Sequence, residues 1–398
     1  MKGFVLVLAA ALLVICSCFS GVQSIEREDI FSLDVGPMED QIAMYNLSGE
    51  IAGRRAGFDM RDGLFYIVDG NGGKIVRYNS YGDMLFMIYN EETNPAPAHL
   101  KTDIEDGAQV TRWAFSYPLR EPGEIAVDSR KHIFVEDRLP RERYGFDSEN
   151  NTLLDRIILH FDSDGRFIDY LGQEGIGGTP FPRIAGIFTS IRDELVVVCR
   201  VPAGWNIFWF DSGNLLYVVR LESANIPTPE DWPQLSVSVD SVMAAPDERR
   251  LYIKADYYRN TFDELTNTRS GTEPYGSVVW ILNVEDGKFA DSMELPFYEI
   301  SVSENGRQEN IRMLYSMLGV MKNGRVLLYY PDDEGYALMF TSANSQERRR
   351  ASIKIDSSAL QYNVFNLSDD GLLSAMLVDD FHVTMAWWRT DRFIGVAQ

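Results

Sequence analysis

The sequence predicts an all-β fold, a six-bladed β-propeller of four-stranded antiparallel blades. Two turn signatures support this prediction, because each recurs six times along the 398 residues with strand-length apolar runs between them. No helical pattern of apolar residues separates the six units. A four-stranded unit cannot bury both of its faces alone, so repeated units of this kind are typical of propellers, in which neighbouring blades cover one another.

The unit from Gly123 to Gly172 shows the pattern most clearly. We expect its strands at 124–128, 132–137, 156–161 and 166–171. The Asp164-Gly165 step supplies the positive φ angles that a right-twisting hairpin favours. The third strand is apolar on both faces of the pleat, at Ile157, Ile158, Leu159 and Phe161. This sheet therefore needs a second sheet on each side.

The two signatures place all six units along the chain. The first is a polar turn followed by an apolar strand, and it begins at residues 61, 129, 191, 246, 322 and 369. The second ends the third strand of a unit with an aromatic residue or Leu, at 78, 161, 210, 282, 340 and 388. The blades are thus expected at about 50–90, 121–172, 182–221, 236–297, 310–356 and 361–397. We expect the segment 29–47 to close the ring beside 392–397.

The second unit resembles NHL-type repeats. The residues that carry the resemblance are Pro122-Gly-Glu-Ile-Ala-Val-Asp128, Ile133-Phe-Val-Glu-Asp137 and Arg156-Ile-Ile-Leu-His-Phe161. The resemblance covers roughly residues 50–398 and implies a six-bladed propeller, but this architecture hosts enzymes, binders and scaffolds alike. A β-sandwich or two smaller β-domains is the alternative, and the absence of a linker-like stretch disfavours it.

The first residues form a leader, with Lys2 before an apolar run from Phe4 to Ile15. Ile15-Cys16-Ser17-Cys18 resembles the signals of bacterial lipoproteins, including those of spirochaetes. The resemblance implies removal of residues 1–17, lipid attachment at Cys18, a tether over 18–28 and a propeller over 29–398. The alternative is an ordinary secretory signal that is cleaved a few residues later.

The net charge of the chain limits the classes of partner that it is expected to bind. The formal net charge of −22 argues against nucleic acid, whose phosphates need a basic protein surface. It also argues against adsorption of the whole body to an anionic membrane. We therefore expect a lipid anchor to hold the protein in the cell envelope, in the periplasm or at the cell surface. Cys199, the one cysteine outside the leader region, lies in an apolar run and is expected in the core.

Five long insertions fall at the same ends of the predicted strands. They are residues 90–120, 138–155, 222–234, 257–276 and 298–310. The hairpins at the opposite strand ends are short in all six units. Because long loops on a rigid scaffold commonly form binding surfaces, we expect one long-loop face that binds a ligand.

Acidic and aromatic residues are predicted to lie on this face. The candidate ligand-binding residues are Asp69, Asp137, Trp205, Trp232, Asp256, Tyr257, Asp333 and Asp380. Carboxylates beside aromatic rings suit a protein, peptide or glycan partner. The alternative is structural, with the acids as solvated loop caps and the aromatic rings as loop packing.

No catalytic set is recognisable in the sequence. The four histidines, His99, His132, His160 and His382, lack the spacing of metal ligands on one element. His132, His160 and His382 are expected to be structural, and His99, in the first long insertion, is the only one with a plausible role in a site. We therefore predict a non-catalytic binding protein without a cofactor. The main alternative is a calcium-dependent lactonase or esterase-like hydrolase, which would need Asp69, Asp137 and Asp256 to converge at the channel mouth.

Overall fold

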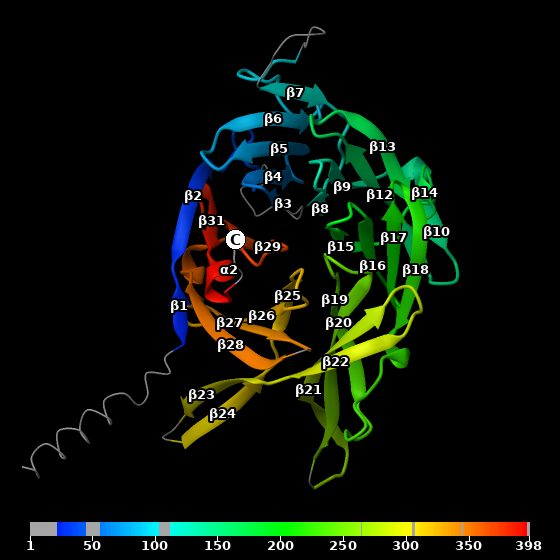
Figure 1. Ribbon diagram of the computed structural model, residues 1–398, viewed down its shortest axis with the longest axis vertical. Helices are drawn as coiled ribbons and strands as arrows, with labels where there is room; N and C mark the ends of the chain where they lie inside the picture. Colours follow the sequence, from blue (N-terminus) through cyan, green and yellow to red (C-terminus); the bar gives the residue numbers. More distant parts are fainter. Residues whose placement is uncertain are drawn as a thin grey trace, which may run out of the picture.

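The fold is a β-propeller, in which antiparallel sheets stand side by side around a central cavity (Figure 1). The computed structural model describes residues 22–44, 56–102, 112–263, 265–304, 307–343 and 345–395. The predicted leader, Cys18 and residues 19–21 of the predicted tether lie outside these residues. The rest of the predicted tether, 22–28, is described, and its residues 23–25 and 27–28 lie in strands. Helical structure in the described part is limited to α2 (Thr390–Phe393) and the 3₁₀ turns η1 (Arg141–Arg143), η2 (Ser223–Asn225) and η3 (Ser357–Ala359).

The β3–β7 sheet comes from the first predicted unit. Its antiparallel strands are β3 (Ala56–Arg61), β4 (Leu64–Asp69), β5 (Lys74–Asn79) and β6 (Met84–Tyr89), and β7 (Trp113–Ser116) adds to β6 in parallel. Asp62 and Gly63 join β3 to β4 with φ angles of 51° and 73°. This polar turn therefore closes the first hairpin in the left-handed region that Asp and Gly tolerate best.

The next two groups of four strands form one continuous sheet. Its first group is β8 (Ile125–Val127), β9 (Ile133–Arg138), β12 (Arg156–Phe161) and β13 (Phe167–Gly172). Its second group is β15 (Ile184–Thr189), β16 (Leu195–Val201), β17 (Gly204–Asp211) and β18 (Asn214–Glu222). The short strand β14 (Gly175–Ile176) pairs with both β13 and β18 and so links them. Gly175 makes the link possible, because a Cβ at this position would lie 2.5 Å from the carbonyl oxygen of Gly213.

Two further sheets follow along the chain. The first contains β19 (Ser236–Ala244), β20 (Arg250–Phe262), β21 (Arg269–Asn283) and β22 (Phe289–Leu295). The second contains β25 (Ser316–Val320), β26 (Val326–Asp332), β27 (Gly335–Ser342) and β28 (Ser345–Lys354). The strand β1 (Gln23–Ile25) pairs in parallel with β28. The start of the described chain is thereby attached to the outer edge of this sheet.

The last sheet takes its outer strand from the beginning of the chain. It contains β29 (Tyr362–Leu367), β30 (Leu373–Val378) and β31 (His382–Trp388), and β2 (Arg27–Asp34) pairs antiparallel with β31. The sequence placed a closing segment beside residues 392–397. Instead the chain turns into α2 after Trp388, so the free edge available to β2 is that of β31.

The core consists of apolar layers between consecutive sheets. Alternate side chains of β12 point to opposite faces of the sheet and pack in two different apolar layers. Ile157, Leu159 and Phe161 pack with residues of β4–β6, while Ile158 packs with Cys199 and other residues of β15–β17. Burial raises the pKa of the Cys199 thiol well above its ordinary value, which is consistent with a packing role.

Apolar packing also joins the first sheet to the last. Phe58 and Phe65 of the β3–β7 sheet share a buried cluster with Met376 and Met385 of β30 and β31. Hydrophobic burial therefore closes the ring together with the pairing of β2 and β31.

Three of the long insertions contain β-hairpins. They are β10 (Gly145–Asp147) with β11 (Thr152–Leu154), the outer part of β20 with β21, and β23 (Tyr298–Glu304) with β24 (Arg307–Met313). In Figure 1 the β20–β21 and β23–β24 hairpins extend outward beyond the ring at its lower edge. We refer to these three elements as the projecting hairpins.

Candidate functional site

A cavity of about 1080 Å³ occupies the centre of the ring. The strands β3, β8, β15, β19, β25 and β29 line it, and these are the innermost strands of their sheets. Small residues on these strands, among them Gly57, Ala126, Gly186 and Gly319, keep the space open. A cavity of this size can accommodate a small molecule.

Asp59 on β3 is a carboxylate of this cavity that is held by hydrogen bonds from two neighbouring strands. Its oxygens accept hydrogen bonds from the backbone N–H of Val127 at 2.7 Å and of Met60 at 2.8 Å, and from the amide of Asn366 at 3.0 Å. Burial raises its pKa, and these donors act in the opposite direction. Asp59 therefore connects β3 to β8 on one side and to β29 on the other.

Paired charges surround one end of the cavity, at the short first hairpins. Arg61 lies 3.4 Å from Asp369, and Lys322 forms an ion pair with Asp370. Burial raises the pKa of Asp369, and the nearby carboxylate of Asp59 raises it further. This end is thus polar and carries charges of both signs.

Sequence reasoning missed Asp59, Asn366 and Asp369. The strand Ala56–Arg61 alternates buried and half-buried residues, with Asp59 between Phe58 and Met60. That alternation could have identified a polar side chain facing the channel, but it could not show that Asn366 approaches from the far end of the chain.

The predicted site residue Asp69 is buried inside its own sheet. Its carboxylate accepts the N–H of Gly72 at 2.6 Å and of Ala43 at 2.8 Å, and it lies 3.9 Å from the Lys74 ammonium. Burial raises the pKa of Asp69 and lowers that of Lys74. This carboxylate holds residues near 43 against the end of β4 and does not line the central cavity.

Asp137 has a similar position at the end of β9. It accepts backbone hydrogen bonds from Glu121 at 2.7 Å and from Arg120 at 3.1 Å. Burial raises its pKa to about 6, and burial raises the pKa of the neighbouring Glu136 to about 7 against the attraction of Arg156. Two carboxyl groups that titrate near neutrality therefore lie at the base of the 138–155 insertion.

Asp256 is held by its neighbours in the β19–β22 sheet. Its oxygens accept hydrogen bonds from the Lys254 ammonium at 2.7 Å and from the Ser277 hydroxyl at 2.5 Å. The structure therefore does not bring Asp69, Asp137 and Asp256 together, and none of them lines the central cavity. Among the described residues, no group of three or more His, Cys, Asp and Glu side chains is placed to hold a metal ion.

The predicted aromatic residues are mostly buried. Trp205 belongs to the core, with the Arg200 guanidinium 5.3 Å from its ring centre. Tyr257 is fully buried, donates its hydroxyl to the carbonyl oxygen of Pro227 and accepts a hydrogen bond from the Trp280 indole at 2.8 Å. Trp232 packs edge-on against Tyr257 and Tyr275. These rings fasten the 222–234 and 257–276 insertions to each other.

Asp333 and Asp380 are exposed, as a ligand-binding residue would require. Asp380 accepts a hydrogen bond from the Gln361 amide at 2.9 Å. The predicted set thus contains five buried residues, the half-buried Trp232 and these two surface carboxylates.

The projecting hairpins carry exposed apolar side chains. Leu265 is 95% exposed and Phe262 is 56% exposed in the β20–β21 hairpin, and Phe146 of β10 is 63% exposed. Ile311 on β24 is also exposed. Exposed apolar residues on the loops of a rigid scaffold can take part in a protein-binding surface.

The comparisons with known proteins concern the fold alone. No protein-family model matches the sequence, and no curated protein matches it. Among solved structures, the chain is similar to a gluconolactonase from Xanthomonas campestris, at 9% identity over 94% of this chain and 99% of that one, with a TM-score of 0.40. It is also similar to the WD40 domain of Toxoplasma gondii coronin, at 7% identity over 93% and 87% of the two chains, with a TM-score of 0.39.

A third similar structure is Kluyveromyces lactis Hsv2, at 11% identity over 60% of this chain, with a TM-score of 0.26. The chain spans 61% of the length of that protein. Similarity this distant does not indicate an activity. No helix in the described ranges is long and apolar enough to cross a bilayer.

Proposed function

We propose that this chain is a lipid-anchored, six-bladed propeller of the cell envelope that binds a protein or peptide through its projecting hairpins, without catalysis. The observation that carries the proposal is the exposure of Phe146, Phe262, Leu265 and Ile311 on the three insertions. Exposing such side chains to water is unfavourable, and burial against a partner would remove them from it.

The scaffold supports this proposal because it fixes the base of the β20–β21 hairpin. The base of the β20–β21 hairpin is fixed by the contacts of Tyr257 with Pro227 and Trp280. Strand pairing then continues outward to Phe262 opposite Arg269. A hairpin that is ordered before binding loses less conformational entropy when a partner docks.

A glycan partner has less support than a protein or peptide. Sugar recognition by aromatic stacking needs an open ring face. Trp205 and Tyr257 are buried, and Trp232 is half-buried between two tyrosines. The exposed apolar side chains on the projecting hairpins are phenylalanine, leucine and isoleucine, which suit an apolar patch on a protein partner better than a sugar ring.

The position of β1 is compatible with the proposed lipid anchor. Gln23 pairs with Ala351 on the outer edge of the ring, five residues after Cys18. Five extended residues span at most about 17 Å. A lipid on Cys18 would therefore hold the β28 edge of the ring close to the membrane surface.

The experiment that tests partner binding uses a photo-crosslinking amino acid at Leu265 in cells that produce the lipidated protein. A matched control carries the same amino acid at Tyr81, which is 88% exposed in a short turn. We expect a specific protein adduct from position 265 and none from position 81. Equal adducts from both positions, or none from positions 146, 262 and 265, would count against the proposal.

One observation favours the calcium-dependent hydrolase as a second candidate. Asp59 and Asp369 both line the central cavity and interact electrostatically, so a pair of carboxyl groups does exist there. Hydrolysis and calcium binding both use such pairs. However, Asp59 already accepts three hydrogen bonds.

A calcium titration separates the two candidates. If the hydrolase proposal holds, calcium raises the melting temperature of the natural protein, and Asp59→Asn reduces that increase. An unchanged melting temperature, together with no lactonase or esterase activity, would remove this candidate.

A further inference from the structure

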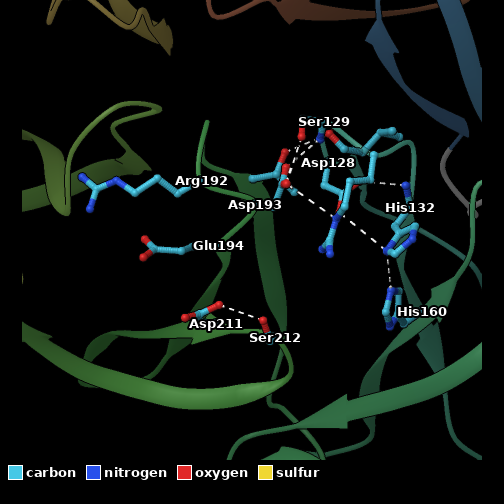
Figure 2. A network of polar contacts seen from close by, with 12 residues as sticks. Asp128, Ser129, His132, His160, Arg192, Asp193, Glu194, Asp211 and Ser212 are labelled. Atoms are coloured by element: carbon cyan, nitrogen blue, oxygen red, sulfur yellow. Dashed lines mark hydrogen bonds and ion pairs between the residues drawn. The ribbon is translucent and has the colours of Figure 1, made fainter.

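A second, smaller pocket lies between the β8–β13 and β15–β18 groups, outside the surface proposed to bind a partner. Its volume is about 190 Å³. Its walls include His132 and His160, apolar side chains such as Phe134, Leu195 and Phe210, and the charged residues Arg130, Asp169 and Asp193. Both histidines were expected to be structural, and their proximity is visible only in the fold (Figure 2).

His160 has the orientation of a metal-binding imidazole. Its Nδ1 lies 3.0 Å from the Asp169 carboxylate, and its ring stacks on Phe134 with centres 4.6 Å apart. A carboxylate that accepts the Nδ1 proton leaves a lone pair on Nε2. Histidine ligands of metal ions commonly have such a carboxylate partner, which holds the ring and its tautomer in place.

That lone pair faces a second imidazole. The Nε2 atom of His160 is 3.3 Å from the Nδ1 atom of His132. Two nitrogen ligands of a tetrahedral ion, each about 2.0–2.1 Å from the metal, are also about 3.3 Å apart. The two rings can therefore hold an ion if His132 carries its proton on Nε2. Without an ion, one of these two nitrogens carries a proton and donates a hydrogen bond to the other.

The surrounding charges favour a cation. Asp128 lies 3.6 Å from the His132 ring, Asp169 lies behind His160, and Asp193 lines the pocket. Arg130 pairs with Asp128 at 3.1 Å and is 3.5 Å from Asp193, so it offsets one of these three carboxylates. The His132 and His160 side chains are 23% and 16% exposed, which leaves a path for an ion from solvent.

We propose that His132 and His160 together bind a divalent late transition-metal ion, Zn²⁺ or Cu²⁺, with water completing its coordination. Imidazole ligands suit both ions. The described residues supply two protein ligands, so the site is open and exchangeable, unlike closed four-ligand structural zinc sites. Asp169 acts as a positioning residue, because its carboxylate contacts Nδ1 of the ligand His160, the nitrogen that faces away from the proposed ion.

The first test is calorimetric titration of the untagged full chain with Zn²⁺ at pH 7.5. We expect one bound ion in the natural protein and loss of that binding in His160→Ala and in His132→Asn. His382→Ala is the matched control and should bind like the natural protein. Circular dichroism and the melting temperature without metal confirm that each variant is folded. Equal zinc binding by His160→Ala, His132→Asn and the natural protein would overturn the proposal.

The second test uses Cu²⁺ and electron paramagnetic resonance. We expect splitting from nitrogen ligands in the natural protein and its loss in His160→Ala. Asp169→Ala should keep the nitrogen signature while weakening the affinity about 10- to 100-fold, as expected for loss of a carboxylate behind a ligand. An unchanged affinity in Asp169→Ala would refute the positioning role, and an unchanged spectrum in His160→Ala would refute the site.

Discussion

The ends of the second strands and the tips of the projecting hairpins both belong to regions with long insertions, but their side chains differ in exposure. Asp69, Asp137 and Asp256 are buried, and their oxygens are occupied by nearby donors. Phe262 and Leu265 instead project into solvent. The buried carboxylates attach loop segments to the ends of the strands, whereas these two apolar side chains have no such structural contact with the described residues to explain their position. A residue's type alone therefore does not tell whether it is buried at these sites.

Loss of the buried Asp69 carboxylate should have the largest effect on stability. Asp69→Ala leaves the Lys74 ammonium without its buried counter-ion and two backbone N–H groups without an acceptor. We expect a loss of about 3–5 kcal/mol in the free energy of unfolding, measured by urea titration. Asp333→Ala, at an exposed position, is the control. A loss below about 1 kcal/mol for Asp69→Ala would contradict the distinction between buried and exposed carboxylates, because Asp69 would then contribute no more to stability than a surface residue.

Removal of the Tyr257 hydroxyl should have a smaller effect. Tyr257→Phe leaves the carbonyl oxygen of Pro227 and the Trp280 indole N–H without their partner. Leaving buried polar groups unsatisfied costs about 1–3 kcal/mol. Urea unfolding measures this loss, with the exposed Tyr81→Phe as control. If the hydroxyl fixes the base of the β20–β21 hairpin, amide exchange in residues 257–262 should also become faster.

The pair Glu136 and Asp137 should make stability depend on pH. Burial raises the pKa of Glu136 from 4.5 in the unfolded chain to about 7 in the fold, so the folded state binds the proton more tightly. This contribution is fully present below about pH 4.5 and is lost as the pH rises through about 7. Glu136→Gln, which mimics the protonated form, should reduce the decline between pH 5 and 8.

Unfolding measured at several pH values checks this expectation, with the exposed Glu149→Gln as control. Asp137 should retain part of the slope in Glu136→Gln, because burial also raises its pKa. A Glu136→Gln profile parallel to that of the natural protein would show that Glu136 titrates normally.

Substitution at a hairpin tip should have the smallest effect on stability. Leu265→Ser changes a side chain that is almost fully exposed, so the free energy of unfolding should move by no more than about 0.5 kcal/mol. Partner capture should nevertheless fall, measured by crosslinking from position 262. A variant that keeps full capture would place the binding surface elsewhere on the ring.

The local architecture was readable from the sequence because its signals are local. Gly63 has a positive φ in the turn where the first signature predicted it, and Gly165 has one in the predicted Asp164-Gly165 turn. Ile157 and Ile158 are both buried, as a strand covered on both faces requires. A side-chain period of two and a short turn are properties of neighbouring residues, so no knowledge of distant contacts was needed.

The candidate site was only partly readable. Asp69 and Asp333 look alike in the sequence, since each follows an apolar second strand, yet one is buried and the other exposed. What separates them is whether another segment arrives to cover the strand end, as residues near 43 do for Asp69. The prediction that the closing segment lies beside residues 392–397 was also wrong. The chain forms α2 after Trp388, so β2 pairs with β31 instead.

By itself, the sequence determined where the strands and tight turns lie and which strands are apolar on both faces, because hydrophobic alternation and turn chemistry act over a few residues. The tertiary structure alone decided which carboxylates are buried, which insertion tips stay in solvent and which histidines meet. Those outcomes depend on the approach of segments far apart in the chain, such as Asp59 with Asn366 and His132 with His160.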